Sequence, residues 1–129
     1  LHNPACGTSR NTLAMIRAAG IEPVVIEYLK RPPSADDIRA IVKATGGTLR
    51  DLIREKGTPF AELGLADPKW TDNDLLGFIA QHPVLLNRPI VMTDKGTALC
   101  RPSEKVLDLL PKGAITQFTK EDGETVKVQ

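Results

Sequence analysis

The sequence predicts an α/β fold, in which a sheet-forming core is interrupted by a mainly helical insertion over about residues 34–82. Strand patterns occur near the two ends of the chain, at residues 23–28 and 90–100. Between them, apolar residues recur at helical spacing behind capping residues. The chain opens on a Pro/Gly turn and a helix, and an α/β fold normally enters such a turn from a strand. We therefore expect one domain over residues 1–129, with the first strand of the fold largely ahead of Leu1.

The first expected elements are a helix and a strand. Leu13 and Ile16 share one helix face within residues 9–19, and Gly20 is a typical helix stop. Residues 23–28 are rich in β-branched side chains and begin with proline, a position where a strand tolerates the missing N–H. A stiff connector with two prolines follows and leads into the insertion.

The insertion is predicted to hold three helices. Ser34 with Asp37, and Thr71 with Asp74, form the capping patterns that open the first and the third of them. The second helix is short and covers residues 48–53. A glycine pair ends the first helix and a His-Pro pair breaks the third.

The C-terminal part returns to strands. Residues 90–93 and 97–100 form a β-hairpin pattern around an Asp-Lys-Gly turn. A last helix is predicted over residues 103–110, where apolar residues recur at helical spacing. From Lys112 onward the chain is polar, and we expect this tail to be loosely held.

Composition excludes several classes of function. Lysine and arginine total 17 against 16 acidic residues, so the formal net charge of +1 is too small for bulk binding of nucleic acid or of a membrane surface. Aromatic residues make up 4%, too few for a platform that stacks single-stranded bases. No apolar run approaches the roughly 20 residues of a membrane span. We expect a globular protein without nucleic-acid or membrane partners.

The two cysteines, Cys6 and Cys100, are too few for a disulfide framework. Free thiols are typical of a reducing compartment, so we expect a cytoplasmic location. The remaining soft ligands are His2 and His82, and no pair among the four residues has the short spacing of a zinc site. We expect no bound metal and no other bound cofactor.

Cys6 lies in a Pro/Gly turn immediately before a helix. Unpaired backbone N–H groups and the helix dipole at that end favour an anion, and so lower the pKa of a thiol placed there. Ser9 and Arg10 are further candidates for supporting the thiolate, as is His2 when protonated. Because Ser9 stands where a dithiol oxidoreductase has its second cysteine, the second thiol must come from Cys100 or from another molecule.

Two other interpretations of Cys6 stay open at this point. It can be a small buried residue packed beneath the helix. It can also be the nucleophile of a cysteine phosphatase, but that class has arginine six residues after the cysteine, where this chain has Thr12. The polar turn favours a reactive thiolate over both.

Three arginines in separate parts of the chain are candidates for binding an oxyanion. Arg88 and Arg101 border the two strands of the predicted hairpin, and strand-end arginines of an α/β fold point toward the edge where ligands bind. Arg54 lies beside the apolar face of the short helix, where a solvated ion pair with Asp51 is the plainer interpretation. If the three converge on Cys6, their guanidinium groups form a cradle for a tetrahedral dianion.

Residues 2–13, HNPACGTSRNTL, resemble the signature of the glutaredoxin-coupled, glutathione-dependent arsenate reductases. The resemblance covers nearly the whole chain and continues at residues 28–29, 32–34, 63–65, 87–91, 99–104 and 118–124. It implies a thioredoxin-like fold with a helical insertion and with a first strand ahead of His2.

The resemblance also implies a role for each site residue. It puts the nucleophile at Cys6, the histidine that tunes the thiolate at His2, and the oxyanion-binding arginines at Arg54, Arg88 and Arg101. The thiolate would attack arsenate, glutathione would act as the co-substrate thiol that releases arsenite, and glutaredoxin would resolve the remaining mixed disulfide. We therefore expect an oxidoreductase of arsenical resistance.

Two alternatives remain beside the arsenate reductase. A non-enzymatic redox-sensing adaptor, or a transcription regulator of the same fold group, would bind a protein partner and sense oxidants through Cys6. A general glutathione-linked thiol reductase would have no oxyanion substrate. Since the regulators of this fold group lack the full arginine set, the three filled positions favour the arsenate reductase.

Overall fold

The computed structural model describes residues 1–113, 115 and 117–127, and the chain divides into two compact units. One unit consists of Leu1–Glu27 with Arg88–Gln129, and the other of Tyr28–Asn87. The second unit contains the segment 34–82 that we expect as a helical insertion. The grouping of both units into a single domain stays a prediction.

The first unit is built around α1 (Gly7–Ala18), the helix predicted over residues 9–19. It begins earlier than predicted because Cys6 itself is the N-cap residue, with extended backbone angles. Its inward face carries two polar and two apolar residues, Ser9, Thr12, Met15 and Ile16. The two apolar ones join a buried cluster with Cys100, Val106, Leu109 and Leu110.

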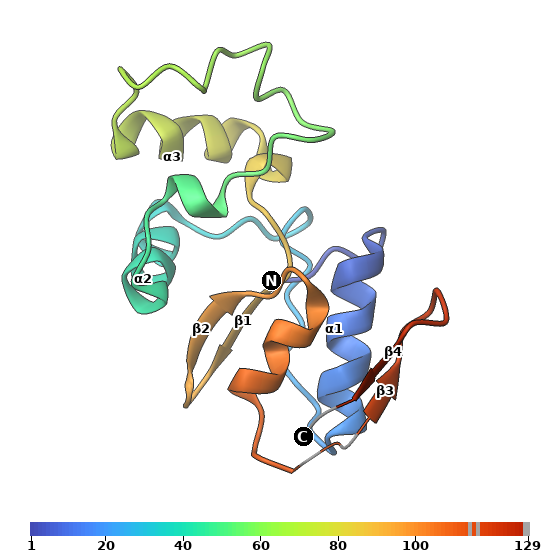
Figure 1. Cartoon of the computed structure of the whole chain (residues 1–129). Helices are drawn as coiled ribbons and strands as arrows, with labels where there is room; N and C mark the ends of the chain where they lie inside the picture. The colour runs from blue at the N-terminus through green and yellow to red at the C-terminus, as the bar shows by residue number, and fades with distance from the viewer. Residues whose placement is uncertain (114, 116, 128–129) are drawn as a thin grey trace. The chain divides into compact units, whose positions relative to one another are not determined.

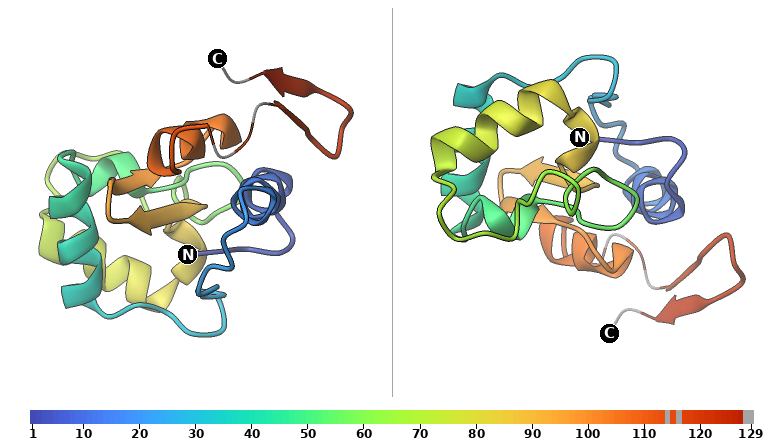
Figure 2. Two further views of the ribbon diagram at one scale, coloured as in Figure 1. Left: turned by 90° about the horizontal axis from the view of Figure 1, so that it is seen from below. Right: turned by 90° about the horizontal axis from the view of Figure 1, so that it is seen from above.

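The predicted hairpin is confirmed. β1 (Ile90–Thr93) pairs antiparallel with β2 (Gly96–Leu99), and Ile90 stands opposite Leu99. The segment predicted as the last helix is a 3₁₀ helix, η3 (Ser103–Leu109). Figure 1 and Figure 2 show η3 alongside the hairpin, where its Val106 is fully buried.

The strand predicted over residues 23–28 is wrong for the described chain. Among the described residues its ladder pairing is limited to a parallel bridge between His2 and Glu27, beside which the His2 N–H donates to the Ile26 carbonyl at 2.8 Å. A strand needs a neighbour along its whole length to pair its N–H and C=O groups. Residues 23–26 have no such neighbour in the described chain, and Val24 is 90% exposed.

The expectation of a loosely held tail is wrong for residues 117–127. They form a second antiparallel hairpin, β3 (Gln117–Thr119) with β4 (Thr125–Lys127). Phe118 and Val126 face each other across this hairpin and pack against the buried cluster of the first unit. This apolar contact ties a polar segment down, and Figure 1 shows the hairpin beside α1. Residues 114, 116 and 128–129 of the predicted tail lie outside the described residues.

The second unit contains the three helices predicted for the insertion. They are α2 (Ala35–Thr45), the short 3₁₀ helix η1 (Arg50–Leu52) and α3 (Asp72–Gln81), followed by a 3₁₀ turn, η2 (Pro83–Leu85). The buried Tyr28 hydroxyl donates to the Leu86 carbonyl at 2.8 Å and closes the unit on itself. None of the helices in the described ranges has the length and apolar character of a membrane-spanning segment.

Both predicted capping boxes are confirmed. The Ser34 hydroxyl accepts from the Asp37 amide at 3.1 Å, and the Thr71 hydroxyl accepts from the Asp74 amide at 3.2 Å. In each box the aspartate carboxylate accepts in return from the backbone amide of the capping residue. These bonds pair amides that the first turn of a helix leaves without a partner.

We predict that Ser34→Ala lowers the free energy of unfolding by about 1 kcal/mol, because the Asp37 amide loses its acceptor. Urea denaturation followed by circular dichroism measures the change. Ser34→Thr is the matched control, since it keeps a hydroxyl at the same position and is expected to stay close to wild type. Equal stability of Ser34→Ala and wild type would contradict the assigned cap.

Candidate active site

Cys6 is presented by a turn that its own neighbours close. The Cys6 N–H donates to the Asn3 carbonyl at 3.0 Å, and the Ala5 N–H donates to Asn3 Oδ1 at 3.0 Å. The Arg10 N–H then donates to the Cys6 carbonyl at 3.0 Å and starts α1. Sequence analysis missed the role of Asn3, although asparagine before proline is a recognised signal for such a turn.

Two arginines donate to the Cys6 sulfur. Arg101 Nη1 lies 3.6 Å from Sγ, and the side chain of Arg88 is a second donor. The same Arg101 nitrogen donates to the Arg88 carbonyl at 3.0 Å, which ties the two residues together. Both precede a proline across a cis peptide bond. The structure therefore brings together two of the three predicted arginines with the predicted nucleophile.

The surroundings of Cys6 stabilise its ionised form. Burial raises the pKa of this half-buried thiol, but the Ser9 backbone amide and the side chains of Arg88 and Arg101 outweigh burial and lower the pKa to about 7. At neutral pH a large share of the molecules consequently carries a nucleophilic sulfur.

Ser9 links Cys6 to His2. Its hydroxyl, fully buried, lies 2.7 Å from His2 Nδ1 and accepts from the Asn3 N–H at 3.1 Å, while its backbone amide favours the Cys6 thiolate. Burial lowers the pKa of His2. The imidazole is thus mainly neutral at pH 7, and the positive charge beside the sulfur comes from the arginines instead.

Arg10 bonds the backbone of the turn that carries Cys6 instead of the Cys6 sulfur in the described contacts. Its Nη1 donates to the Pro4 carbonyl at 2.8 Å, and its other nitrogens donate to the Glu121 carboxylate. The hydrogen bond to Glu121 is the main cause that raises the pKa of Arg10, and the nearby Cys6 charge acts in the same direction. The contact with Glu121 joins segments far apart in the sequence, and no local pattern signals it.

Arg54 lies in the second unit, directly after Ile53, which forms an antiparallel bridge with Leu86. Its Nε donates to the Lys56 carbonyl at 3.0 Å and its Nη1 to Asn87 Oδ1 at 3.5 Å. Convergence of Arg54 with Cys6 stays a prediction.

Cys100 is a packed thiol. It is fully buried in the cluster of the first unit, and its Sγ donates weakly to the Ala98 carbonyl at 3.7 Å. Burial raises the pKa of Cys100 to about 12, so it stays protonated at neutral pH. Of the two possibilities left open by the sequence, the structure favours packing over a spare nucleophile.

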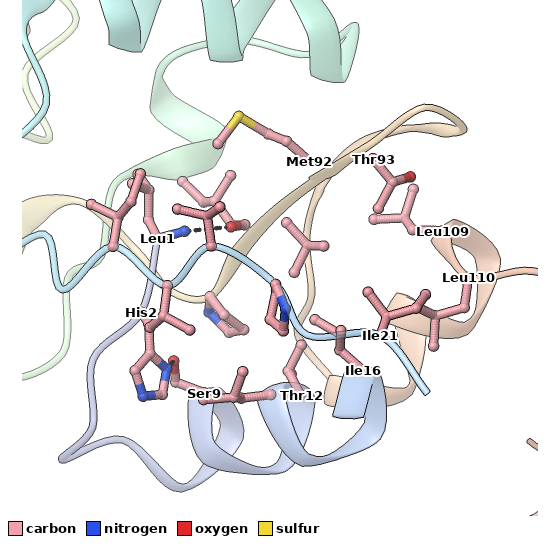
Figure 3. Close-up of a pocket in the computed structure, with 18 of the residues that line it drawn as sticks. Leu1, His2, Ser9, Thr12, Ile16, Ile21, Met92, Thr93, Leu109 and Leu110 are labelled. Atoms are coloured by element: carbon pink, nitrogen blue, oxygen red, sulfur yellow. Dashed lines mark hydrogen bonds between the residues drawn. The ribbon is translucent and has the colours of Figure 1, made fainter. Parts of the chain in front are cut away.

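The first unit also contains a cavity of about 520 Å³, between segment 21–26 and β1. Figure 3 shows its mainly apolar wall, with His2 and Ser9 on one side and Leu109 and Leu110 on another. Cys6 is not among its lining residues, so we assign the chemistry of the site to the turn and not to this cavity. No group of three or more metal-ligating side chains was found within the described residues.

Comparison with known proteins yields matches along nearly the whole chain. A sequence profile of the ArsC family matches residues 1–109. An arsenate reductase of Rhizobium meliloti (strain 1021) is 63% identical over 125 residues, which cover 97% of this chain and 89% of the relative. An arsenate reductase of Escherichia coli is 58% identical over 97% of this chain and 89% of its own length. The solved structure of an arsenate reductase from Vibrio cholerae superposes with a TM-score of 0.80 at 38% identity, covering 84% of this chain and 93% of that one.

We predict that alkylation of Cys6 by iodoacetamide accelerates as pH rises and reaches half of its maximal rate near pH 7, the pKa of this thiol. Arg101→Ala is expected to move that midpoint to higher pH, because the thiolate loses a donor. Arg17→Ala, which breaks an exposed ion pair with Glu22 in the last turn of the same helix, is the matched control. Mass spectrometry assigns the modified residue, and Cys100 should stay unmodified in the folded protein. A midpoint near the ordinary cysteine value of about 8.5 would contradict the assigned environment.

Proposed function

Because this chain belongs to the ArsC family and shares more than half of its residues with the arsenate reductases of Rhizobium meliloti and Escherichia coli, it reduces arsenate to arsenite, and we propose that Cys6 is the nucleophile of the reaction. The protein is therefore an oxidoreductase. Its α/β, thioredoxin-like fold, predicted from the sequence, is confirmed by the superposition on a solved relative.

One observation carries the assignment of Cys6. Its sulfur accepts from Arg101 at 3.6 Å and from Arg88, and its pKa of about 7 makes it a thiolate when arsenate is a doubly charged oxyanion. A nucleophile and an anionic substrate repel each other unless positive charge lies between them. The two guanidinium groups supply that charge, and their planar forks match the oxygen geometry of a tetrahedral anion.

The proposed reaction begins with attack of the Cys6 thiolate on arsenic(V). An S–As bond forms, and one arsenate oxygen leaves as water after taking up protons. The remaining arsenate oxygens would be bound by Arg88, Arg101 and Arg54. The Ser9 backbone N–H would donate to the Cys6 sulfur when that sulfur is again a thiolate. His2, mainly neutral and bonded to Ser9, would keep that amide in place instead of supplying charge.

A second thiol completes the reduction, and we assign it to glutathione. Its sulfur attacks the Cys6 sulfur, the S–As bond breaks, and the bonding electron pair stays on arsenic, which leaves as arsenite. Cys6 is left in a mixed disulfide with glutathione, and glutaredoxin would restore its thiolate by disulfide exchange. The buried, protonated Cys100 supports an external thiol for this step. A cytoplasmic location is part of the proposal, because both reductants belong to reducing compartments.

We predict that Cys6→Ser abolishes arsenite production while the protein stays folded, because a hydroxyl at that position is not ionised at neutral pH. Arsenite is measured with glutathione and glutaredoxin together and with each omitted. Cys100→Ala is the matched control and should retain activity, since its thiol takes no part. Arsenite formed by Cys6→Ser would refute the assigned nucleophile. Turnover of a generic disulfide in preference to arsenate would support a general thiol reductase instead.

We also predict that Arg88→Ala, Arg101→Ala and Arg54→Ala each lower kcat/KM for arsenate by about ten- to a hundredfold, the usual effect of losing a charged hydrogen bond. Steady-state kinetics with varied arsenate gives the values, and Arg17→Ala, in the last turn of α1, serves as the control. Loss in the first two variants but not in Arg54→Ala would remove Arg54 from the cradle. No loss in any of the three would refute it altogether.

A further inference from the structure

An ion pair joins the first turns of α1 to the tip of the C-terminal hairpin. Arg10 Nη2 lies 2.7 Å from Glu121 Oε1, and Arg10 Nε lies 3.1 Å from Glu121 Oε2. The guanidinium therefore holds both carboxylate oxygens, the two-pronged geometry that makes arginine–carboxylate pairs strong and directional. We call this pair, with its bond to Pro4, the Arg10–Glu121 clamp.

The clamp reaches the turn that carries Cys6. The remaining terminal nitrogen of Arg10, Nη1, donates to the Pro4 carbonyl at 2.8 Å. Pro4 lies inside the turn that the Cys6 N–H closes on Asn3. Because Glu121 holds one side of the Arg10 guanidinium, the guanidinium in turn holds the Pro4 carbonyl of this turn in place.

Glu121 is itself held against the helix. Its backbone N–H donates to Asn11 Oδ1 at 3.1 Å. The neighbouring Lys120, whose side chain is 10% exposed, bonds Glu104 at 2.8 Å and ties the hairpin to η3. A methyl group placed on Gly7 would lie 3.1 Å from Glu121 Oε1, so the carboxylate rests directly beside the residue that follows Cys6.

Stability alone does not account for this arrangement. The side chains of Arg10 and Glu121 are 45% and 46% exposed, and exposed ion pairs contribute little to the free energy of folding. The pair is directed at a backbone carbonyl of the turn, two residues before the nucleophile. Its effect is expected in the placement of the sulfur, where small displacements alter rates strongly.

We propose that Glu121 is a positioning residue for the reaction, which acts through Arg10 and the Pro4 carbonyl to hold the Cys6 turn in its reactive geometry. The proposal rests on the proposed role of Cys6 as nucleophile. It gives the C-terminal hairpin a part in the chemistry, although the hairpin does not contribute a donor to the sulfur in the described contacts.

The test uses Glu121→Ala, Arg10→Lys and the double variant in the full chain. Lysine keeps the positive charge but donates from a single nitrogen, so it cannot span the Glu121 carboxylate and the Pro4 carbonyl as the planar guanidinium does, and Arg10→Lys separates geometry from charge. Each single variant is expected to lower kcat about three- to tenfold with no rise in KM for arsenate. The double variant should lose no more than the worse single one, because both substitutions break the same clamp.

The chain offers a matched control. Arg17 holds both carboxylate oxygens of Glu22 at 3.1 Å in the last turn of α1, an exposed pair of the same kind. Glu22→Ala should leave kcat unchanged. A loss in Glu22→Ala as large as in Glu121→Ala, full activity of Arg10→Lys, or additive losses in the double variant would each overturn the proposal.

The pH dependence of Cys6 alkylation by iodoacetamide tests the Arg10–Glu121 clamp in the absence of arsenate. In Arg10→Lys the midpoint pH is expected to rise by about half a unit, because the thiolate is less firmly held against its donors. This shift would support the clamp even if arsenate reduction failed. An unchanged midpoint together with an unchanged kcat would overturn it. Circular dichroism checks folding, and Glu121→Gln, which keeps an acceptor for Arg10, should recover part of the lost rate.

Discussion

The hydrogen bonds from Arg88 and Arg101 to the Cys6 sulfur are the contacts on which the site depends. Burial by itself would raise the pKa of this thiol, and these donors, with the Ser9 amide, reverse the direction. The two arginines meet because β1 and β2 pair with Ile90 opposite Leu99, which brings the residues flanking the hairpin to one end of it. The reactivity of the cysteine therefore depends on strand register, since a slip of one residue would offset the two flanking arginines from each other along the hairpin.

The two cysteines show how strongly the surroundings decide the chemistry of one residue type. Cys6 stands at the start of a helix among charged donors, with a pKa of about 7, whereas Cys100 lies in an apolar cluster, with a pKa of about 12. Cys100 and Arg101 are neighbours in the chain, yet one points into the core and the other reaches the reactive sulfur. The segment directly after β2 therefore contributes one residue to the core and the next residue, with its positive charge, to the site.

Local signals predicted the elements that local bonds determine. The capping boxes at Ser34 and Thr71 were evident in the sequence because both partners of each bond lie within four residues. Two predictions, a strand at residues 23–28 and a loosely held tail at residues 117–127, were wrong for a common reason. The structure of each segment depends on contacts with residues distant in the sequence. In the first segment these contacts are limited to a single bridge, and in the second they are provided by apolar packing on α1.

The sequence by itself determined which residues can carry the chemistry: a cysteine at a helix start, arginines at strand ends and a serine where a dithiol oxidoreductase has its second cysteine. Those properties belong to residue type and to position beside a turn or strand. The tertiary structure alone decided that two of the arginines reach one sulfur, that His2 is held neutral by burial, and that Glu121 lies against the first turn of α1. Such pairings join residues about a hundred positions apart, and their strength falls off with a distance that only folding sets.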